Sequence, residues 1–143
     1  MPMFEAFEFN NNSPIYLQIT KFFEAMVFLG ELKPGDLIPS RRELAGEMRV
    51  NLNTVQKSYA YMEEIGLITT EKNRYSVITK DTDKIEELKN NYIKEPLIIF
   101  LKTMKSINIS KDSVLELIDK YYDIVDEMEG LEDDNCKESD KKI

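Results

Sequence analysis

Two short helical patterns lie close together between residues 40 and 65, and their spacing restricts the fold more than any other feature of the sequence. The segment Ser40-Arg41-Arg42-Glu43 is a capping box, which predicts the start of the first helix. Asn51 is a good N-cap for the second helix, which is expected to run to about Ile65 before Gly66 ends it. Only three or four residues separate the two helices, and this spacing is typical of a helix-turn-helix.

The segments on either side extend this motif to a complete small domain. Residues 15–27 follow helical spacing, with Ser13-Pro14 suited to the start of a helix and Gly30 to its stop. After the second helix, residues 67–70 and 75–79 are β-prone and flank a polar turn, which predicts a hairpin. The order of helix, short helix, helix and hairpin predicts a winged helix. The expected fold is therefore mainly α with a small β wing.

Beyond the hairpin the pattern changes to two longer helices. The first is expected over residues 83–106, with a kink or break near residues 94–95, because Pro96 cannot donate a backbone hydrogen bond. Ser110 is expected to cap the second, which should run to about Met128. The apolar face of this last helix is wider than a two-helix hairpin can cover by itself.

We therefore expect a second copy of the chain to cover that face, which makes a homodimer. The residues expected to form the dimerisation surface are Leu97, Leu101, Met104, Val114, Ile118, Tyr121 and Val125. The predicted organisation is an N-terminal arm over residues 1–12, a winged-helix domain over 13–80, a helical dimerisation or effector segment over 81–129, and a disordered acidic tail over 130–143.

The net charge of −8 is unevenly distributed along the chain. Residues 13–80 carry nine basic and eight acidic side chains, whereas residues 81–143 carry ten basic and seventeen acidic ones. Net acidity argues against a chain that binds nucleic acid along its whole length. Because the acidity belongs to the C-terminal half, the predicted winged helix remains suited to a nucleic acid.

The residue types in the sequence give no indication of an enzyme active site. The sequence has no His, which is the usual general base and the commonest metal ligand. No nucleophile–base pair, phosphate-binding loop or cluster of metal ligands is visible, so neither an enzyme nor a bound cofactor is expected. One cysteine excludes an intrachain disulfide, the N-terminus lacks a signal-peptide pattern, and the longest apolar run, residues 97–101, is too short to cross a membrane. These features predict a cytoplasmic protein without a membrane partner.

The chain resembles the winged-helix domain of GntR-superfamily transcription regulators in four segments, which keep the family's order and spacing: PIYLQI, GELKPGDLIPSRRELA, VNLNTVQKSY and EEIGLI. The segment LNTVQ is most similar to the YtrA-like subfamily. About 63 residues follow the winged helix, which fits the two dimerising helices of that subfamily and is too short for the larger C-terminal domains of other branches. The resemblance implies a homodimeric repressor that binds a palindromic operator in double-stranded DNA and controls an ABC-transporter operon.

The resemblance also implies that residues 51–65 form a recognition helix in the major groove. Asn and Gln side chains match the edge of adenine, and Thr can contact a thymine methyl group. The residues predicted to read bases are Asn53, Thr54 and Gln56, and those predicted to contact phosphate are Asn51 and Lys57. Arg42 matches an arginine that contacts DNA in the family, whereas Arg41 is an addition to the pattern. Lys72 and Arg74 of the wing would reach the minor groove or the backbone.

Each of these polar residues also has a simpler interpretation. Asn51 is an N-cap in any case, and Asn53 and Gln56 could face only solvent. Arg41 and Arg42 could form surface pairs with nearby acids, which contribute roughly 0–1 kcal/mol each. A protein-interaction module that no longer reads DNA therefore remains the alternative function. An unknown small-molecule effector is also left open, with a cleft between subunits as its place.

The sequence departs from the family pattern at two turns. Met48 and Arg49 replace a Leu-Gly pair, so either residue 49 adopts a strained left-handed conformation or the turn differs. In the wing, Asn73 and Tyr75 stand where a glycine pair is usual, whereas Lys72 and Arg74 keep the wing basic.

Overall fold

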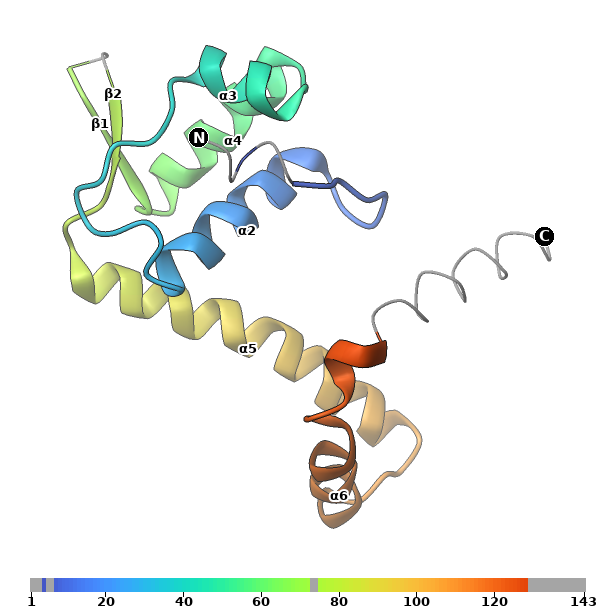
Figure 1. The fold of residues 1–143 in the computed structure, drawn as a ribbon. Helices are drawn as coiled ribbons and strands as arrows, with labels where there is room; N and C mark the ends of the chain where they lie inside the picture. Colours follow the sequence, from blue (N-terminus) through green and yellow to red (C-terminus); the bar gives the residue numbers. More distant parts are fainter. Residues whose placement is uncertain (1–3, 5–6, 73–74, 129–143) are drawn as a thin grey trace. The chain divides into compact units, whose positions relative to one another are not determined.

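The computed structural model describes residue 4, residues 7–72 and residues 75–128 (Figure 1). Its elements in chain order are α2 (Ile15–Phe28), α3 (Arg41–Met48), α4 (Leu52–Glu64), β1 (Ile68–Glu71), β2 (Tyr75–Ile78), α5 (Thr82–Ser106) and α6 (Lys111–Tyr121). Internal contacts divide the chain into a first unit, Met1–Lys94, and a second unit, Glu95–Ile143. The predicted fold class, mainly α with a small β wing, is confirmed.

The core of the first unit forms where α2, α3 and α4 meet (Figure 1). Phe23 of α2 and Leu44 of α3 are fully buried there. The residues predicted for the inner face of α4, Val55, Tyr59 and Met62, are buried as well. Because these side chains of α4 pack into the core, the opposite side of the helix makes no core contact and is free to bind another molecule.

The two caps of the helix-turn-helix form as predicted. The Ser40 hydroxyl accepts a hydrogen bond from the Glu43 amide at 3.1 Å, and the Asn51 side chain accepts one from the Asn53 amide at 2.8 Å. Between the helices, Arg49 adopts φ 57° and ψ 46°, so the turn keeps a left-handed residue although no glycine is present. A residue with a side chain is strained in the left-handed conformation. Of the two alternatives that the sequence left for this turn, the structure therefore has the strained left-handed residue 49.

The start of α2 differs from the prediction for Ser13. Pro14 is the N-cap, and no side chain caps the helix. The Gln18 side chain instead donates to the carbonyl oxygens of Ser13 at 2.7 Å and Asn10 at 2.8 Å, and it accepts from the Asn10 amide at 3.0 Å. The buried amide of Gln18 thus fixes the preceding loop, and the cap expected from Ser13 does not form. At the other end Gly30, with φ 81°, closes the helix as predicted.

The N-terminal arm contributes to the core, which its sequence did not indicate. Phe4 is fully buried, with its ring centroid 5.5 Å from that of Phe22 and 5.2 Å from that of Phe23. Phe7 also packs on Phe22, at 4.9 Å between centroids. These aromatic contacts attach the arm to α2.

The wing is an antiparallel hairpin in which Ile68 pairs with Ile78 and Glu71 with Tyr75. Glu71 thus belongs to β1, whereas the sequence placed it in the turn. Lys72 follows with a positive φ of 48°, and the predicted turn residues Asn73 and Arg74 lie outside the described residues. The segment before α3 also runs beside β2, because Leu37 forms a bridge with Val77.

The later helices require two corrections. Helix α5 is continuous from Thr82 to Ser106, so the break expected near residues 94–95 is wrong. Pro96 removes only the one backbone hydrogen bond that residue 92 would accept, and the helix continues on either side. Helix α6 ends at Tyr121 rather than near residue 128, and a turn over 122–124 separates it from helical backbone at 125–128. The predicted tail, 130–143, lies outside the described residues.

Candidate nucleic-acid interface

The first turns of α4 present polar side chains to solvent. Asn53, Gln56 and Lys57 are exposed, and Thr54 is half-buried, whereas Val55 points into the core. Positions 56 and 57 lie three and four residues after position 53, so both neighbour Asn53 on the helix surface. The structure therefore brings Asn53 and Gln56, two of the three predicted base-reading residues, together with Lys57 on the side that the core leaves free.

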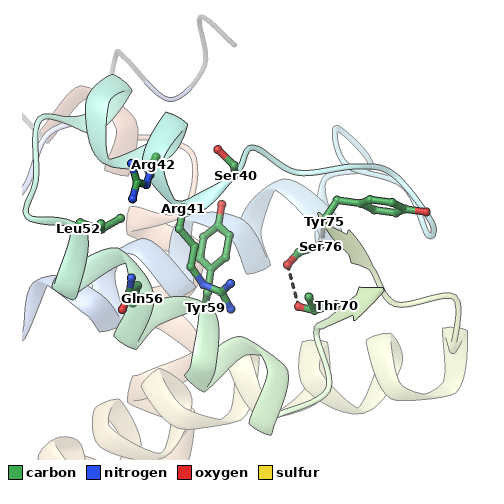
Figure 2. Close-up of a pocket in the computed structure, with 9 residues that line it drawn as sticks. All are labelled: Ser40, Arg41, Arg42, Leu52, Gln56, Tyr59, Thr70, Tyr75 and Ser76. Atoms are coloured by element: carbon green, nitrogen blue, oxygen red, sulfur yellow. Dashed lines mark hydrogen bonds between the residues drawn. The ribbon is translucent and has the colours of Figure 1, made fainter. Parts of the chain in front are cut away.

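A cleft of about 250 Å³ opens beside this face, between α3, α4 and the hairpin (Figure 2). Its walls combine two arginines, an amide and several hydroxyl groups. The lining residues are Ser40, Arg41, Arg42, Leu52, Gln56, Tyr59, Thr70, Tyr75 and Ser76. The cleft thus joins three of the predicted DNA-binding residues, Arg41, Arg42 and Gln56, which come from two different helices.

The two neighbouring arginines have different surroundings. The Arg41 guanidinium donates to Glu63 Oε1 at 3.2 Å and lies 5.4 Å from the ring centroid of Tyr59. Arg42 is exposed, and its side chain has no ionic partner among the residues that the structure describes. The surface pair that the sequence left open for both arginines therefore exists for Arg41.

Tyr59 ties α4 to the segment before α3. Its hydroxyl donates to the Pro39 carbonyl oxygen at 2.6 Å. Burial raises the pKa of the Tyr59 hydroxyl above its usual range; the charge of Arg41 opposes this effect, and the carboxylates of Glu43 and Glu47 reinforce it. The hydroxyl consequently stays protonated and remains a donor at neutral pH.

Lys57 lies against the start of α2. Its ammonium nitrogen is 4.2 Å from the centroid of the Tyr16 ring, and Tyr16 in turn meets the edge of Tyr61 at 5.9 Å between centroids. A cation–π contact at an exposed site contributes roughly 0.5–1 kcal/mol and leaves the positive charge in place. The contact therefore orients the Lys57 side chain, and its positive charge can still attract a phosphate.

The wing contributes one described cation and one exposed aromatic residue. Lys72 is exposed at the end of the hairpin, whereas Arg74 lies outside the described residues. Tyr75 begins β2 and is half exposed, and its ring extends away from Gln56 and Arg42 in Figure 2. Sequence reasoning named Tyr75 only as a departure from the glycine pattern and did not place it beside the cleft.

The second unit carries the predicted dimerisation residues on a largely exposed apolar surface. Five of them are exposed, namely Leu97, Leu101, Ile118, Tyr121 and Val125. Met104 is half-buried, and Val114 is buried within the unit. Four of the seven residues line one apolar groove of about 400 Å³, which is formed by Phe100, Met104, Leu117, Ile118, Tyr121, Tyr122 and Val125.

The described part of the chain offers neither a metal site nor a helix that could span a membrane. No group of three or more Asp, Glu or Cys side chains there could hold a metal ion. None of the described helices combines the length and apolar composition needed to span a bilayer.

A helix-turn-helix whose second helix has a free polar face, set beside a cleft with two arginines and a hairpin, is the arrangement of a winged-helix transcription regulator. The family model described as "Bacterial regulatory proteins, gntR family" matches residues 15–78. The HTH-type transcriptional regulator YhcF of Bacillus subtilis is 37% identical over 109 residues, which cover 76% of this chain and 90% of YhcF. The HTH-type transcriptional repressor YtrA of the same organism is 39% identical over 88 residues, which cover 61% of this chain and 68% of YtrA.

Among solved structures, a GntR family transcriptional regulator from Listeria monocytogenes superimposes with a TM-score of 0.74 at 32% identity, covering 78% of this chain and 98% of that one. The chain belongs to the GntR family of bacterial regulatory proteins and is of its YtrA-like subfamily. The relatives are named as regulators of transcription, in agreement with the expectation that the chain is not an enzyme.

Proposed function

We propose that the chain is a homodimeric repressor in which each copy inserts α4 into the major groove at one half of a palindromic operator. The observation that carries this proposal is the exposed polar face at the start of α4, beside the cleft with Arg42. The printed name of YtrA, a transcriptional repressor, supports the direction of regulation.

The roles of the individual residues follow from their chemistry. Asn53 and Gln56 can donate to and accept from adenine, and Thr54 can contact a thymine methyl group. Phosphate contacts are assigned to residues that carry a positive charge or lie at the helix start, where backbone amides also point outward. These residues are Arg42, Asn51, Lys57, Lys72 and Arg74, with Arg41 as a predicted member already engaged by Glu63.

The second unit supports the homodimer. Its apolar side chains, such as Leu101 and Ile118, are exposed to water, which is energetically unfavourable. A second copy of the chain has the same apolar surface, so the two surfaces can bury each other in a twofold dimer. One recognition helix makes few base contacts. A dimer that reads two half-sites doubles them, and its twofold symmetry matches a palindrome.

The regulated genes and the effector rest on the resemblance alone. Control of an ABC-transporter operon is the expectation for the YtrA-like subfamily. A small-molecule effector, if one acts, would bind in a cleft that the dimer forms.

The test is a selection of DNA by the full chain from a random duplex library, followed by binding measurements on the selected site. Gln56→Ala should lower the affinity by roughly 1–3 kcal/mol and relax the preference at one position of each half-site. Asn90→Ala removes an exposed amide from α5 and serves as the control, since it should leave the preference unchanged.

The result also decides between the two functions. Enrichment of a palindrome supports the repressor. If the folded chain enriches no sequence, the alternative, a protein-interaction module, gains support from the net charge of −8.

A further inference from the structure

Glu63, in the last turn of α4, connects the three elements that surround the cleft. Its Oε1 accepts from the Arg41 guanidinium of α3 at 3.2 Å and from the hydroxyl of Thr70 in β1. The Thr70 hydroxyl also lies 2.9 Å from the hydroxyl of Ser76 in β2, as Figure 2 shows. One carboxylate oxygen therefore links α3, α4 and both strands of the wing.

Arg41 is held on two sides by this arrangement. Besides Glu63, its guanidinium lies against the ring of Tyr59, which is itself buried in the core. The side chains of Arg41 and Glu63 are only 37% and 36% exposed, so the pair is partly shielded from solvent. Arg42, one residue later, has neither contact and faces solvent.

We infer that Glu63 limits the sequence-independent affinity for DNA by holding Arg41 in an intramolecular ion pair and out of contact with phosphate. This inference rests on the proposed function and names a residue that the predicted DNA-binding set does not contain. Glu63 acts through Arg41 and Thr70, so it is a positioning residue and does not itself touch DNA.

Sequence-independent affinity for DNA comes from contacts between positive side chains and phosphates. Each Lys or Arg that neutralises a phosphate releases counterions and strengthens binding to any DNA, whatever its sequence. An arginine paired inside the protein adds no such contact. Keeping Arg41 on Glu63 therefore leaves base reading by α4 as a larger share of the total binding free energy. The Thr70 hydroxyl meanwhile bonds the wing to α4 through the same carboxylate.

The experiment compares the selected operator with an unrelated duplex of equal length over a series of salt concentrations. The full chain is tested as wild type, Glu63→Gln, Arg41→Gln and the double variant. Gln at position 63 keeps an oxygen that can accept from Thr70 but loses the charge that holds Arg41. Glu64→Gln is the matched control, because Glu64 is the exposed neighbour in the same turn and the charge change is identical.

Glu63→Gln should steepen the slope of log affinity against log salt by about one unit on both duplexes. Both duplexes should then bind about three- to tenfold more tightly at low salt, so the sequence-independent affinity rises while the ratio between the two affinities stays close to that of the wild type. Arg41→Gln should leave the slope unchanged, and the double variant should return it to the wild-type value. Glu64→Gln should not change the slope. A purely structural role of Glu63 would not produce a change in slope that disappears when Arg41 is removed.

Two results would overturn the inference while leaving the repressor intact. One is a wild-type slope for Glu63→Gln in a protein whose circular dichroism shows it to be folded. The other is a slope that becomes shallower by about one unit in Arg41→Gln, as is expected for Arg42→Gln. That result would mean that Arg41 of the wild type leaves Glu63 and contacts a phosphate when DNA binds. A wild-type chain that binds neither duplex overturns the proposed function and this inference together, so the two failures can be told apart.

Discussion

The two units treat their apolar side chains in opposite ways. In the first unit, Phe23, Leu44 and Val55 come from three different helices and are fully buried against one another. In the second unit, Ile99, Ile107 and Tyr122 are each more than 60% exposed, although they are as apolar as the residues of the core. Single exposed apolar residues are ordinary, but a continuous surface of them marks an interaction site. The first unit therefore completes its own core, whereas the second leaves apolar side chains exposed, as the proposed homodimer requires.

The polar contacts of the two units differ in the same way. Thr20 of α2 and Ser58 of α4 share a buried hydrogen bond at 3.0 Å across 38 residues of sequence. In the second unit, Thr103 donates to the Ile99 carbonyl and the Ser110 hydroxyl to that of Ser113, each within about one helical turn. Long-range polar contacts fix how helices sit against each other, and local ones only support single helices.

Removing a large side chain from the completed core should have the largest effect. Phe23→Ala should lower the free energy of unfolding by about 3–5 kcal/mol, because the cavity would lie between the rings of Phe4 and Tyr59. Leu29→Ala, at a position that is 74% exposed in the same segment, should change it by less than about 0.5 kcal/mol. Urea unfolding at one protein concentration measures both. Equal losses in the two variants would contradict the assignment of the core.

Truncation in the second unit should act on assembly and not on the fold of the single chain. Ile118→Ala should weaken the dimer by about 2–4 kcal/mol, since both copies lose apolar contact, which raises the dissociation constant by about two orders of magnitude. The helix itself should persist, because Ala favours helix. Sedimentation equilibrium measures the constant, and circular dichroism the helix.

Glu116→Ala, on the polar side of α6, is the control for this prediction and should leave the dissociation constant close to that of the wild type. The comparison between the units fails if the wild-type chain is monomeric at high concentration. It also fails if Ile118→Ala unfolds the chain at every concentration.

The sequence predicted most of the first unit because its signals are local. The caps at Ser40 and Asn51 and the inner face of α4 each depend on a few neighbouring residues, and all of them form. Burial of Phe4 depends on contacts with α2, for which the arm carries no periodic pattern. The end of α6 at Tyr121 was missed because neither Gly nor Pro marks it.

The exposed polar face of the candidate site was predictable for the same reason. The exposed face of Asn53 and Gln56 follows from helical periodicity once Val55 is placed in the core. The link between Arg41, Glu63 and Thr70 joins three elements, and no spacing in the sequence indicates it. Interactions that depend on how elements are placed in space appear only in the structure.

Loss of one buried hydroxyl should have an intermediate effect and an identifiable dependence on pH. Tyr59→Phe should cost about 1–3 kcal/mol at neutral pH, because the buried Pro39 carbonyl loses its donor. Tyr122→Phe, at a position that is 76% exposed in the second unit, should cost less than about 0.5 kcal/mol. Both are measured by urea unfolding.

The pH dependence of the wild type should follow from the raised pKa of Tyr59. An unfolded tyrosine ionises near about pH 10, whereas the folded one holds its proton to higher pH. The stabilisation is therefore complete below about pH 10 and is lost as the pH rises toward the folded pKa. Wild type should lose more stability than Tyr59→Phe between about pH 9.5 and 11. Parallel losses would show that other groups cause the alkaline unfolding.

The smallest expected effects concern the two left-handed residues that end helices, one in each unit. Arg49 has φ 57° and Asn108 has φ 60°, so both occupy a region that glycine adopts without strain. For Arg49 the relief of strain, about 1–2 kcal/mol, should exceed the extra flexibility that glycine gives the unfolded chain, about 0.4–1 kcal/mol. Arg49→Gly should therefore stabilise the first unit by about 0.5 kcal/mol, and Arg49→Ala should not.

Asn tolerates this conformation better than Arg because its short side chain can bond locally. Asn108→Gly relieves little strain, so the greater flexibility of the unfolded chain should dominate. The free energy of unfolding should therefore fall by a few tenths of a kcal/mol. Urea midpoints measured at one concentration would test the opposite signs. A gain at both positions would mean that Asn108 is strained as well, and that the second unit stores conformational strain in addition to exposing its apolar surface.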